Sequence, residues 1–134
     1  MTCMAWIRKI GAGGFGPGSV FNKAGFNSDL NGWHLRAGAE ATFQVGGSAA
    51  IAYTLASSAL SNGLWYHVAV TWDGETAAGS ANIYINGHLD NASEPTTGGT
   101  VVSDADNDLM LGDRFSANRP FDGYMDGWQL YNRV

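Results

Sequence analysis

Residues 64–74, LWYHVAVTWDG, decide the fold of this chain, and residues 81–90, ANIYINGHLD, follow them closely. Positions 65–72 are rich in β-branched and aromatic residues and end at Asp-Gly, a pattern typical of a strand and its turn. Alternation with a period of two places Tyr66, Val68, Val70 and Trp72 on one face, which is bulky enough for a core. The Asn86-Gly87 pair predicts a type I′ hairpin. Three antiparallel strands are therefore expected in succession.

The composition of the 134-residue chain indicates one all-β domain. Nineteen glycines, 12% aromatic residues and the lack of a long helical period favour short strands joined by many turns. In the last strand, we expect alternation to place Tyr124, Asp126, Trp128 and Leu130 together, with their apolar groups in the core. Residues 91–99 are predicted to be a loop. The other expected strands are 2–10, 19–23, 32–36, 41–45 and 49–55, and the last strand covers 124–134. The apolar residues 101–102 and 109–111 bracket the acidic run 103–108.

Charge, hydropathy and cysteine content exclude several classes of protein. Twelve acidic against seven basic residues give a net charge of −5, which argues against nucleic-acid binding. No apolar run approaches the roughly 20 residues that span a bilayer, and the start does not resemble a signal sequence. Cys3 is the single cysteine, so no intrachain disulfide is possible, and we predict a buried, inert thiol.

Three segments carry a family resemblance. They are the central stretch described above, residues 109–112 (LMLG) with 120–132 (PFDGYMDGWQLYN), and residues 4–7 (MAWI). Their order and spacing match those of one known group of domains. Together they resemble the laminin G-like and pentraxin-like jelly rolls of the concanavalin A-like lectin/glucanase superfamily. This resemblance implies an antiparallel two-sheet β-sandwich of jelly-roll type and favours an extracellular or cell-surface location. Because such folds host many unrelated functions, it says little about the ligand.

The resemblance also bears on the chain ends. Residues 1–134 are expected to form a single laminin G-like domain that is shorter at both ends than most members of the family. Such shortening would leave a sheet edge unpaired, and an unpaired edge invites pairing with another chain. We therefore expect either a homodimer through a sheet edge or a trimmed chain.

Catalysis is not expected, because the required carboxylates are missing from any one strand. Hydrolases of the resembled superfamily carry Glu-x-Asp-x-Glu on one strand, where alternation places nucleophile and acid/base on the same face. Here Glu40, Glu75 and Glu94 are far apart in sequence and outside such a pattern. A glycoside hydrolase or lyase is kept as an alternative.

Two acidic features are candidate calcium ligands. Asp104, Asp106 and Asp108 would share a face on an extended backbone, and carboxylate oxygens suit a hard cation such as calcium. A solvated acidic loop and a catalytic role are the alternatives for these three. By the resemblance, Asp126 matches a final-strand aspartate that often binds a structural calcium ion. The alternative for Asp126 is a side chain bound to neighbouring backbone amides.

The candidate ligand-binding residues are aromatic and polar. Trp33 and Phe115 are expected to be partly exposed, whereas most tryptophans on the strand motifs, including Trp6, Trp65, Trp72 and Trp128, are expected to pack in the core. Aromatic faces beside planar polar groups suit a sugar, although ordinary packing is the alternative for each residue. The full candidate set is Trp33, Asp113, Arg114, Phe115 and Asn118. The sequence thus favours a non-catalytic recognition module for carbohydrate with a possible structural calcium ion; a protein-protein assembly module is the alternative.

Overall fold

The computed structural model of the chain describes residues 1–14, 16–25, 31–93 and 98–134. These residues form eleven strands and no helix. The strands are β1 (Thr2–Lys9), β2 (Gly18–Asn22), β3 (Trp33–Ala37), β4 (Glu40–Gly46), β5 (Ile51–Ala59), β6 (Trp65–Trp72), β7 (Ala81–Ile85), β8 (His88–Leu89), β9 (Asn91–Ser93), β10 (Met110–Leu111) and β11 (Gly123–Tyr131). The described part of the chain therefore holds no helix with the length and apolarity that a membrane crossing requires.

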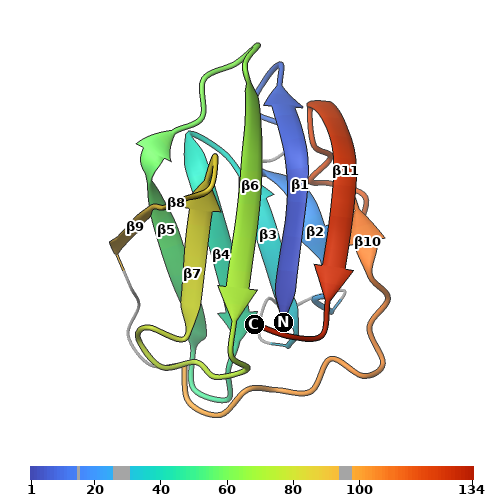
Figure 1. Cartoon of the computed structure of the whole chain (residues 1–134). Helices are drawn as coiled ribbons and strands as arrows, with labels where there is room; N and C mark the ends of the chain where they lie inside the picture. The colour runs from blue at the N-terminus through green and yellow to red at the C-terminus, as the bar shows by residue number, and fades with distance from the viewer. Residues whose placement is uncertain (15, 26–30, 94–97) are drawn as a thin grey trace.

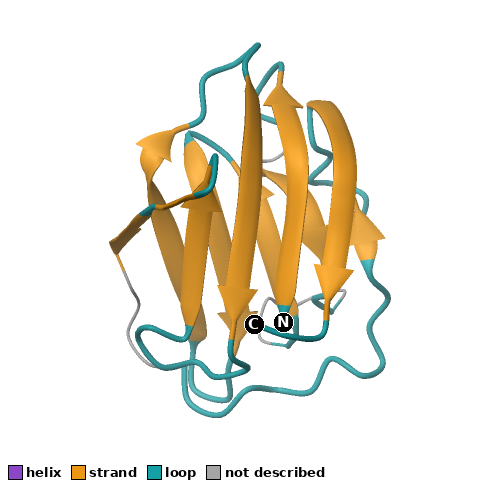
Figure 2. Cartoon of the chain, viewed as in Figure 1, coloured by secondary structure: helices purple, strands orange, loops and turns teal. Residues whose placement is uncertain are grey.

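The strands form two sheets that stack face to face (Figure 1). Sheet A has the order β11-β1-β6-β7-β8, and sheet B has the order β10-β2-β3-β4-β5-β9. Every strand pair is antiparallel, and the longer turns and loops gather at the two ends of the stack (Figure 2). The predicted antiparallel β-sandwich is thus confirmed.

The core lies between the sheets and follows the alternation expected of strands. In β6, Val68 and Val70 are fully buried, and they face Phe43 of β4 and Leu35 of β3 from the opposite sheet. Burial of such side chains contributes roughly 1.5–3 kcal/mol each. The stretch that predicted the fold therefore supplies the centre of the core.

The predicted hairpin is also confirmed. Asn86 has φ of 52° and Gly87 has φ of 83°, the two positive values that a type I′ turn requires. The Oδ1 atom of Asn86 accepts a hydrogen bond of 2.9 Å from the backbone N–H of His67. The turn thereby joins β7 and β8 and is tied to the neighbouring strand β6.

Strand β11 departs from the predicted alternation because it contains a β-bulge. Met4 pairs with Gln129 but Trp6 pairs with Asp126, so Gly127 and Trp128 together oppose a single residue of β1. The φ of 56° at Gly127 is of the kind that glycine adopts at a bulge. The extra residue reverses the faces of the strand beyond it. The predicted grouping of Tyr124, Asp126, Trp128 and Leu130 on one face is therefore wrong.

The same bulge explains why β11 adds little to the core. Tyr124 points outward and is 58% exposed, while Trp128 and Leu130 lie on the inner side of the edge strand but remain 55% and 40% exposed. Met125 is the residue of this strand that packs against the core. The two sheets are held together chiefly by β1, β6 and β7 against β2, β3 and β4.

For most of the tryptophans, the burial in the structure differs from the burial that the sequence predicted. Trp6 and Trp65 point away from the core and are 47% and 45% exposed. Trp128 is also exposed, at 55%. Of the four tryptophans expected in the core, Trp72 is the one that is buried. Trp33, which was expected to be partly exposed, is 4% exposed. Trp6 and Trp65 lie on the outer face of sheet A, whereas Trp128 lies on the inner side of an edge strand and stays exposed there.

The two long sides of the sandwich differ. On one side the chain crosses from sheet A to sheet B between β8 and β9, and the side chain of Asn91 bonds to the backbone of Ile83 and Ala81. Strand β9 falls in a segment that was predicted to be a loop. On the other side, β11 and β10 are both edge strands (Figure 1). Val101, which precedes the acidic run, forms an isolated bridge with Gly47.

Candidate functional site

A hollow of about 400 Å³ opens at the end of the sandwich where both termini lie (Figure 1). Sheet A provides one wall through the ends of β6 and β11. Sheet B provides the opposite wall through β3 and the segments that flank it. The lining residues are Met1, Lys23, Trp33, Trp72, Asp104, Leu130, Tyr131 and Asn132.

Aromatic side chains form the inner part of the hollow. The ring centroids of Trp33 and Phe43 are 6.1 Å apart, and those of Phe43 and Trp72 are 6.0 Å apart. The indole N–H of Trp72 donates a 2.7 Å hydrogen bond to the backbone oxygen of Glu75. Since both indoles are largely buried, their orientation is fixed before any ligand arrives, which lowers the entropic cost of binding.

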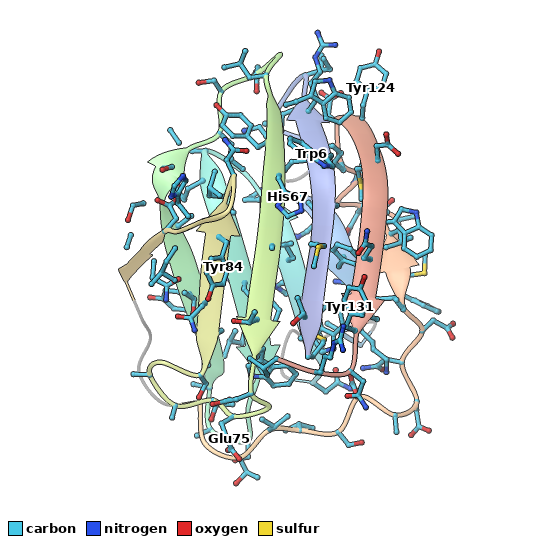
Figure 3. All side chains as sticks on the ribbon, in the orientation of Figure 1. Trp6, His67, Glu75, Tyr84, Tyr124 and Tyr131 are labelled. Carbon is cyan, nitrogen blue, oxygen red and sulfur yellow. The ribbon has the colours of Figure 1, made fainter. Side chains whose placement is uncertain are left out.

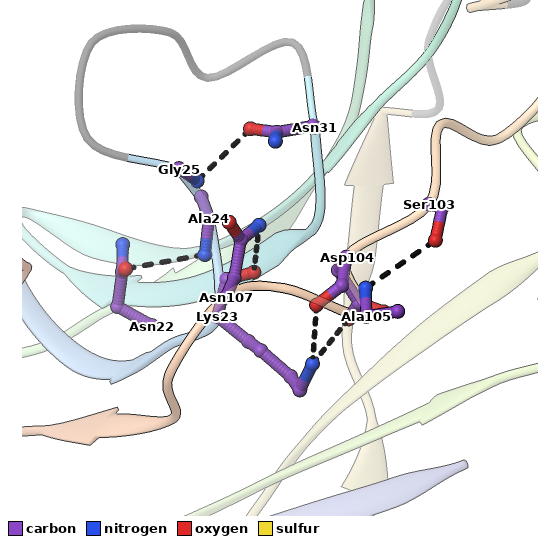
Figure 4. A network of polar contacts seen from close by, with 9 residues as sticks. All are labelled: Asn22, Lys23, Ala24, Gly25, Asn31, Ser103, Asp104, Ala105 and Asn107. Atoms are coloured by element: carbon purple, nitrogen blue, oxygen red, sulfur yellow. Dashed lines mark hydrogen bonds and ion pairs between the residues drawn. The ribbon is translucent and has the colours of Figure 1, made fainter.

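An ion pair lies on the sheet B side of the hollow. Lys23 Nζ lies 3.3 Å from Asp104 Oδ2 and donates a 2.6 Å hydrogen bond to the backbone oxygen of Asp104 (Figure 4). The two side chains are 26% and 32% exposed, so each is partly held and partly open to solvent. The Asn107 side chain donates to the backbone oxygen of Lys23 at 3.3 Å. The turn that carries Asp104 is thereby fastened to the end of β2.

The end of β11 completes the hollow. Tyr131 is 38% exposed, and its hydroxyl donates a 2.5 Å hydrogen bond to Gln129 Oε1. The Arg133 guanidinium lies 5.3 Å from the centroid of the Tyr131 ring, which adds a cation–π contact. Thr2 Oγ1 donates to the backbone oxygen of Arg133 at 2.7 Å and holds this segment against the start of β1.

The hollow combines groups of three kinds that a polar organic ligand can use. Trp33, Trp72 and Tyr131 offer aromatic carbon, Lys23 offers N–H donors, and Asp104 offers acceptor oxygens. A concave, mostly apolar site with a few convergent polar groups is the usual form of a ligand-binding pocket. These groups can bind a polar ligand through hydrogen bonds and aromatic contact.

The predicted residues are divided between several places. Trp33 lies in this hollow, and it is joined there by Asp104, which had been considered as a metal ligand, a solvated loop residue or a catalytic group. Sequence reasoning missed Lys23, Tyr131 and Asn132. Their signal was weak, since residues 23, 33, 104 and 131 meet only after four separate segments have folded together.

Asp113, Arg114 and Asn118 bond within their own loop and away from Trp33. Asp113 Oδ1 accepts the backbone N–H groups of Arg114 and Arg119, at 2.7 and 3.0 Å. Asn118 Oδ1 accepts from Arg114 Nε at 2.6 Å and from the Ser116 hydroxyl. These contacts stabilise the loop, so the predicted set does not form one cleft.

Phe115 lines a second hollow of about 180 Å³ together with Asp106 and Asp108. The segment that carries these aspartates is a turn, in which Asn107 N–H donates to the backbone oxygen of Asp104 at 2.9 Å. Because the backbone is not extended, Asp104 does not share a face with Asp106 and Asp108.

The candidate calcium ligands do not converge. Asp126 is exposed on the outer face of sheet A, and its Oδ1 accepts the N–H of Gly127 at 2.7 Å, as the alternative interpretation expected. Among the described residues, no group of three or more His, Cys, Asp or Glu side chains is placed to hold a metal ion. Calcium takes six to eight oxygen ligands, which include backbone carbonyls and waters as well as carboxylates, so calcium binding by these aspartates stays a prediction.

Comparison with known families gives one match. The family model for Laminin G 3, described as the concanavalin A-like lectin/glucanases superfamily, covers residues 1–134. No curated protein matches the chain.

Proposed function

The chain belongs to the concanavalin A-like lectin/glucanase superfamily, and on this basis we propose that it is a non-catalytic module that binds carbohydrate in the hollow between Trp33, Tyr131 and Asp104. The observation that carries the proposal is the meeting of three aromatic rings with a partly exposed ion pair in one concave site. A sugar presents both C–H faces and hydroxyl groups, and this site has partners for each.

The hydroxyl groups of a sugar would bond to the polar rim. Lys23 Nζ can donate, Asp104 Oδ2 can accept, and the Asn132 amide can do both. Hydrogen bonds to charged groups contribute about 1.5–3 kcal/mol, so two or three of them give specificity without any metal ion. The aromatic carbon of Tyr131 would lie against the apolar face of the ring.

A non-catalytic role is supported by the positions of the glutamates. Glycosidases need two carboxyl groups about 5–10 Å apart. Glu40 begins β4 at the end of the sandwich that carries Lys9, whereas Glu75 lies at the opposite end (Figure 3). Glu94 lies outside the described residues. The two described glutamates therefore belong to different ends of the molecule.

The test uses a glycan array followed by titration of the best oligosaccharide, with tryptophan fluorescence as the signal. Asp104→Asn removes the carboxylate charge but keeps the backbone oxygen that Lys23 already binds. We expect affinity to fall tenfold or more in this variant. Asp106→Asn is the matched control, because it removes the same charge two residues away in a different hollow.

Two results would contradict the proposal. One is equal loss of affinity in Asp104→Asn and Asp106→Asn, which would indicate a general charge effect. The other is an array without any bound glycan for a protein whose unfolding is cooperative. Turnover of a bound glycan would instead identify the alternative, a glycoside hydrolase or lyase.

Assembly through a sheet edge is the second candidate function, and the open side of the sandwich favours it. Strand β11 is a nine-residue edge strand without Lys or Pro, and β10 beside it exposes Leu111 at 38%. Unpaired edges of this kind add strands from other chains. We expect light scattering to report a homodimer that Trp128→Lys converts to a monomer; a monomeric wild-type protein would refute this candidate.

A further inference from the structure

The outer face of sheet A is rich in exposed aromatic side chains. Trp6 is 47% exposed at its centre, and Tyr124 at 58% and Tyr131 at 38% flank it along the sheet (Figure 3). His67 and Tyr84 lie on the same face and are half-buried. These five residues, Trp6, His67, Tyr84, Tyr124 and Tyr131, are called the aromatic face below.

The rings of this face are held in place by their neighbours. Trp6 and His67 make an edge-on contact with centroids 5.3 Å apart and planes at 62°. The Arg8 guanidinium lies 5.9 Å from the Tyr124 centroid, and Arg8 Nε donates to the backbone oxygen of Gly63 at 2.9 Å. Tyr131 is fixed by its bond to Gln129. A ligand that stacks on these rings therefore pays little to order them.

The strand register sets the spacing of the rings. Tyr131 pairs with Thr2, Trp6 follows four residues later on β1, and Tyr124 pairs with Arg8 two residues further on. At about 3.4 Å per residue, the level of Tyr131 lies roughly 14 Å from that of Trp6, and the level of Trp6 lies roughly 7 Å from that of Tyr124. A single sugar ring cannot reach from Tyr131 to Tyr124, but an extended chain of several sugars can.

Charge and composition decide what kind of partner fits this face. The chain carries a net charge of −5, yet the outward-pointing charges of the sheet A strands are one Arg8 guanidinium and one Asp126 carboxylate. Between the levels of Tyr131 and Trp6 lie Gln129 and the apolar residues Met4 and Ala69, while the polar Thr71 and Asn82 lie level with Tyr131. A face with balanced charge that carries aromatic rings and hydrogen-bonding groups fits an uncharged polymer better than a polyanion.

We infer that the aromatic face binds an extended, uncharged polysaccharide by stacking of its sugar rings on Trp6, Tyr124 and Tyr131. This surface lies on the outside of sheet A and shares Tyr131 with the rim of the hollow, whereas Trp6 and Tyr124 do not line the hollow. Trp6 contributes most, because it is the largest ring and lies between the other two. A sugar ring packs its C–H groups against the face of an aromatic side chain, whose π-system carries partial negative charge.

The test measures the fraction of protein bound to suspensions of cellulose, chitin and xylan. We expect Trp6→Ala to reduce binding at least tenfold, and Trp6→Tyr, which keeps an aromatic ring, to restore most of it. Tyr53→Ala is the matched control. Tyr53 is 43% exposed, close to the 47% of Trp6, but it lies on β5 of sheet B.

Several outcomes would overturn this inference. The first is failure of the wild-type protein to bind any of the three suspensions. The others are equal binding by Trp6→Ala and the wild type, and equal loss of binding in Trp6→Ala and Tyr53→Ala. A change in sedimentation of Trp6→Ala without a change in polymer binding would assign the face to contact between protein copies instead. Asp104→Asn should keep full binding to the suspensions while losing the soluble oligosaccharide, so the two proposals fail separately.

Discussion

Cys3 offers a quantitative test of the packing around β1. Its side chain is 0% exposed, and it pairs with Val70 of β6 on one side and with Leu130 of β11 on the other. Burial raises the pKa of the Cys3 thiol from 9.0 to about 12, because the interior does not solvate a thiolate. This position is the centre of sheet A, so any loosening of β1 would return the pKa toward 9.0.

The direction of the pH effect follows from the two pKa values. Above pH 9.0 the unfolded chain loses the thiol proton while the folded chain keeps it, so the stability present below pH 9.0 is lost as pH rises toward about 12. The loss is roughly 1.4 kcal/mol per pH unit, which amounts to about 2 kcal/mol between pH 9 and 10.5. At pH 8 the folded thiol should also react roughly a thousandfold more slowly than the unfolded one.

The assay is urea unfolding of the wild type and Cys3→Ala at pH 8 and pH 10.5, followed by fluorescence. Tyrosines and lysines titrate alike in both proteins, so the difference between their pH dependences isolates Cys3. The cavity left in Cys3→Ala lowers stability at both pH values equally and does not affect this difference. Parallel pH curves for the two proteins, or rapid thiol labelling of the folded wild type, would refute the reasoning.

Three further expectations concern stability, each measured by urea unfolding. Gly32→Ala should lower the free energy of unfolding by well over 2 kcal/mol, because φ is +75° and the new Cβ would lie within 3 Å of backbone atoms. Gly63→Ala, with φ of +81° but open space around it, should lower it by about 1 kcal/mol. Equal losses in the two variants would contradict the steric explanation. Ile83→Ala should cost about 2–5 kcal/mol because Ile83 is fully buried, while Leu89→Ala, at 61% exposure, should stay within about 0.5 kcal/mol. Asn86→Ala should cost about 1–2 kcal/mol through its positive φ, and an unchanged midpoint would contradict the assigned turn.

Local sequence patterns were sufficient for the strands and the hairpin. The run 65–72 is a strand with the bounds expected from its composition, and Asn86-Gly87 forms the expected turn. Both features depend on residues that are close in sequence, where side-chain alternation and positive φ act directly. Strand β11 shows the limit of such patterns, because the single residue added at Gly127 reverses every position after it.

The candidate sites were much less predictable. Aromatic residues on strands were assigned to the core, yet Trp6 and Trp65 point to solvent and Trp33 points inward. Composition cannot distinguish these cases, since a strand offers the same alternation to both of its faces. Asp104 was noted for its charge, but its pairing with Lys23 joins positions 81 residues apart.

The sequence by itself determined that this chain is an antiparallel sandwich of the lectin/glucanase superfamily, because strand period, turn residues and family motifs are local properties. The tertiary structure alone decided which faces meet, that one side of the sandwich stays open, and which distant residues share a hollow. These depend on how two sheets stack, and stacking is chosen by the summed burial of many side chains rather than by any short stretch.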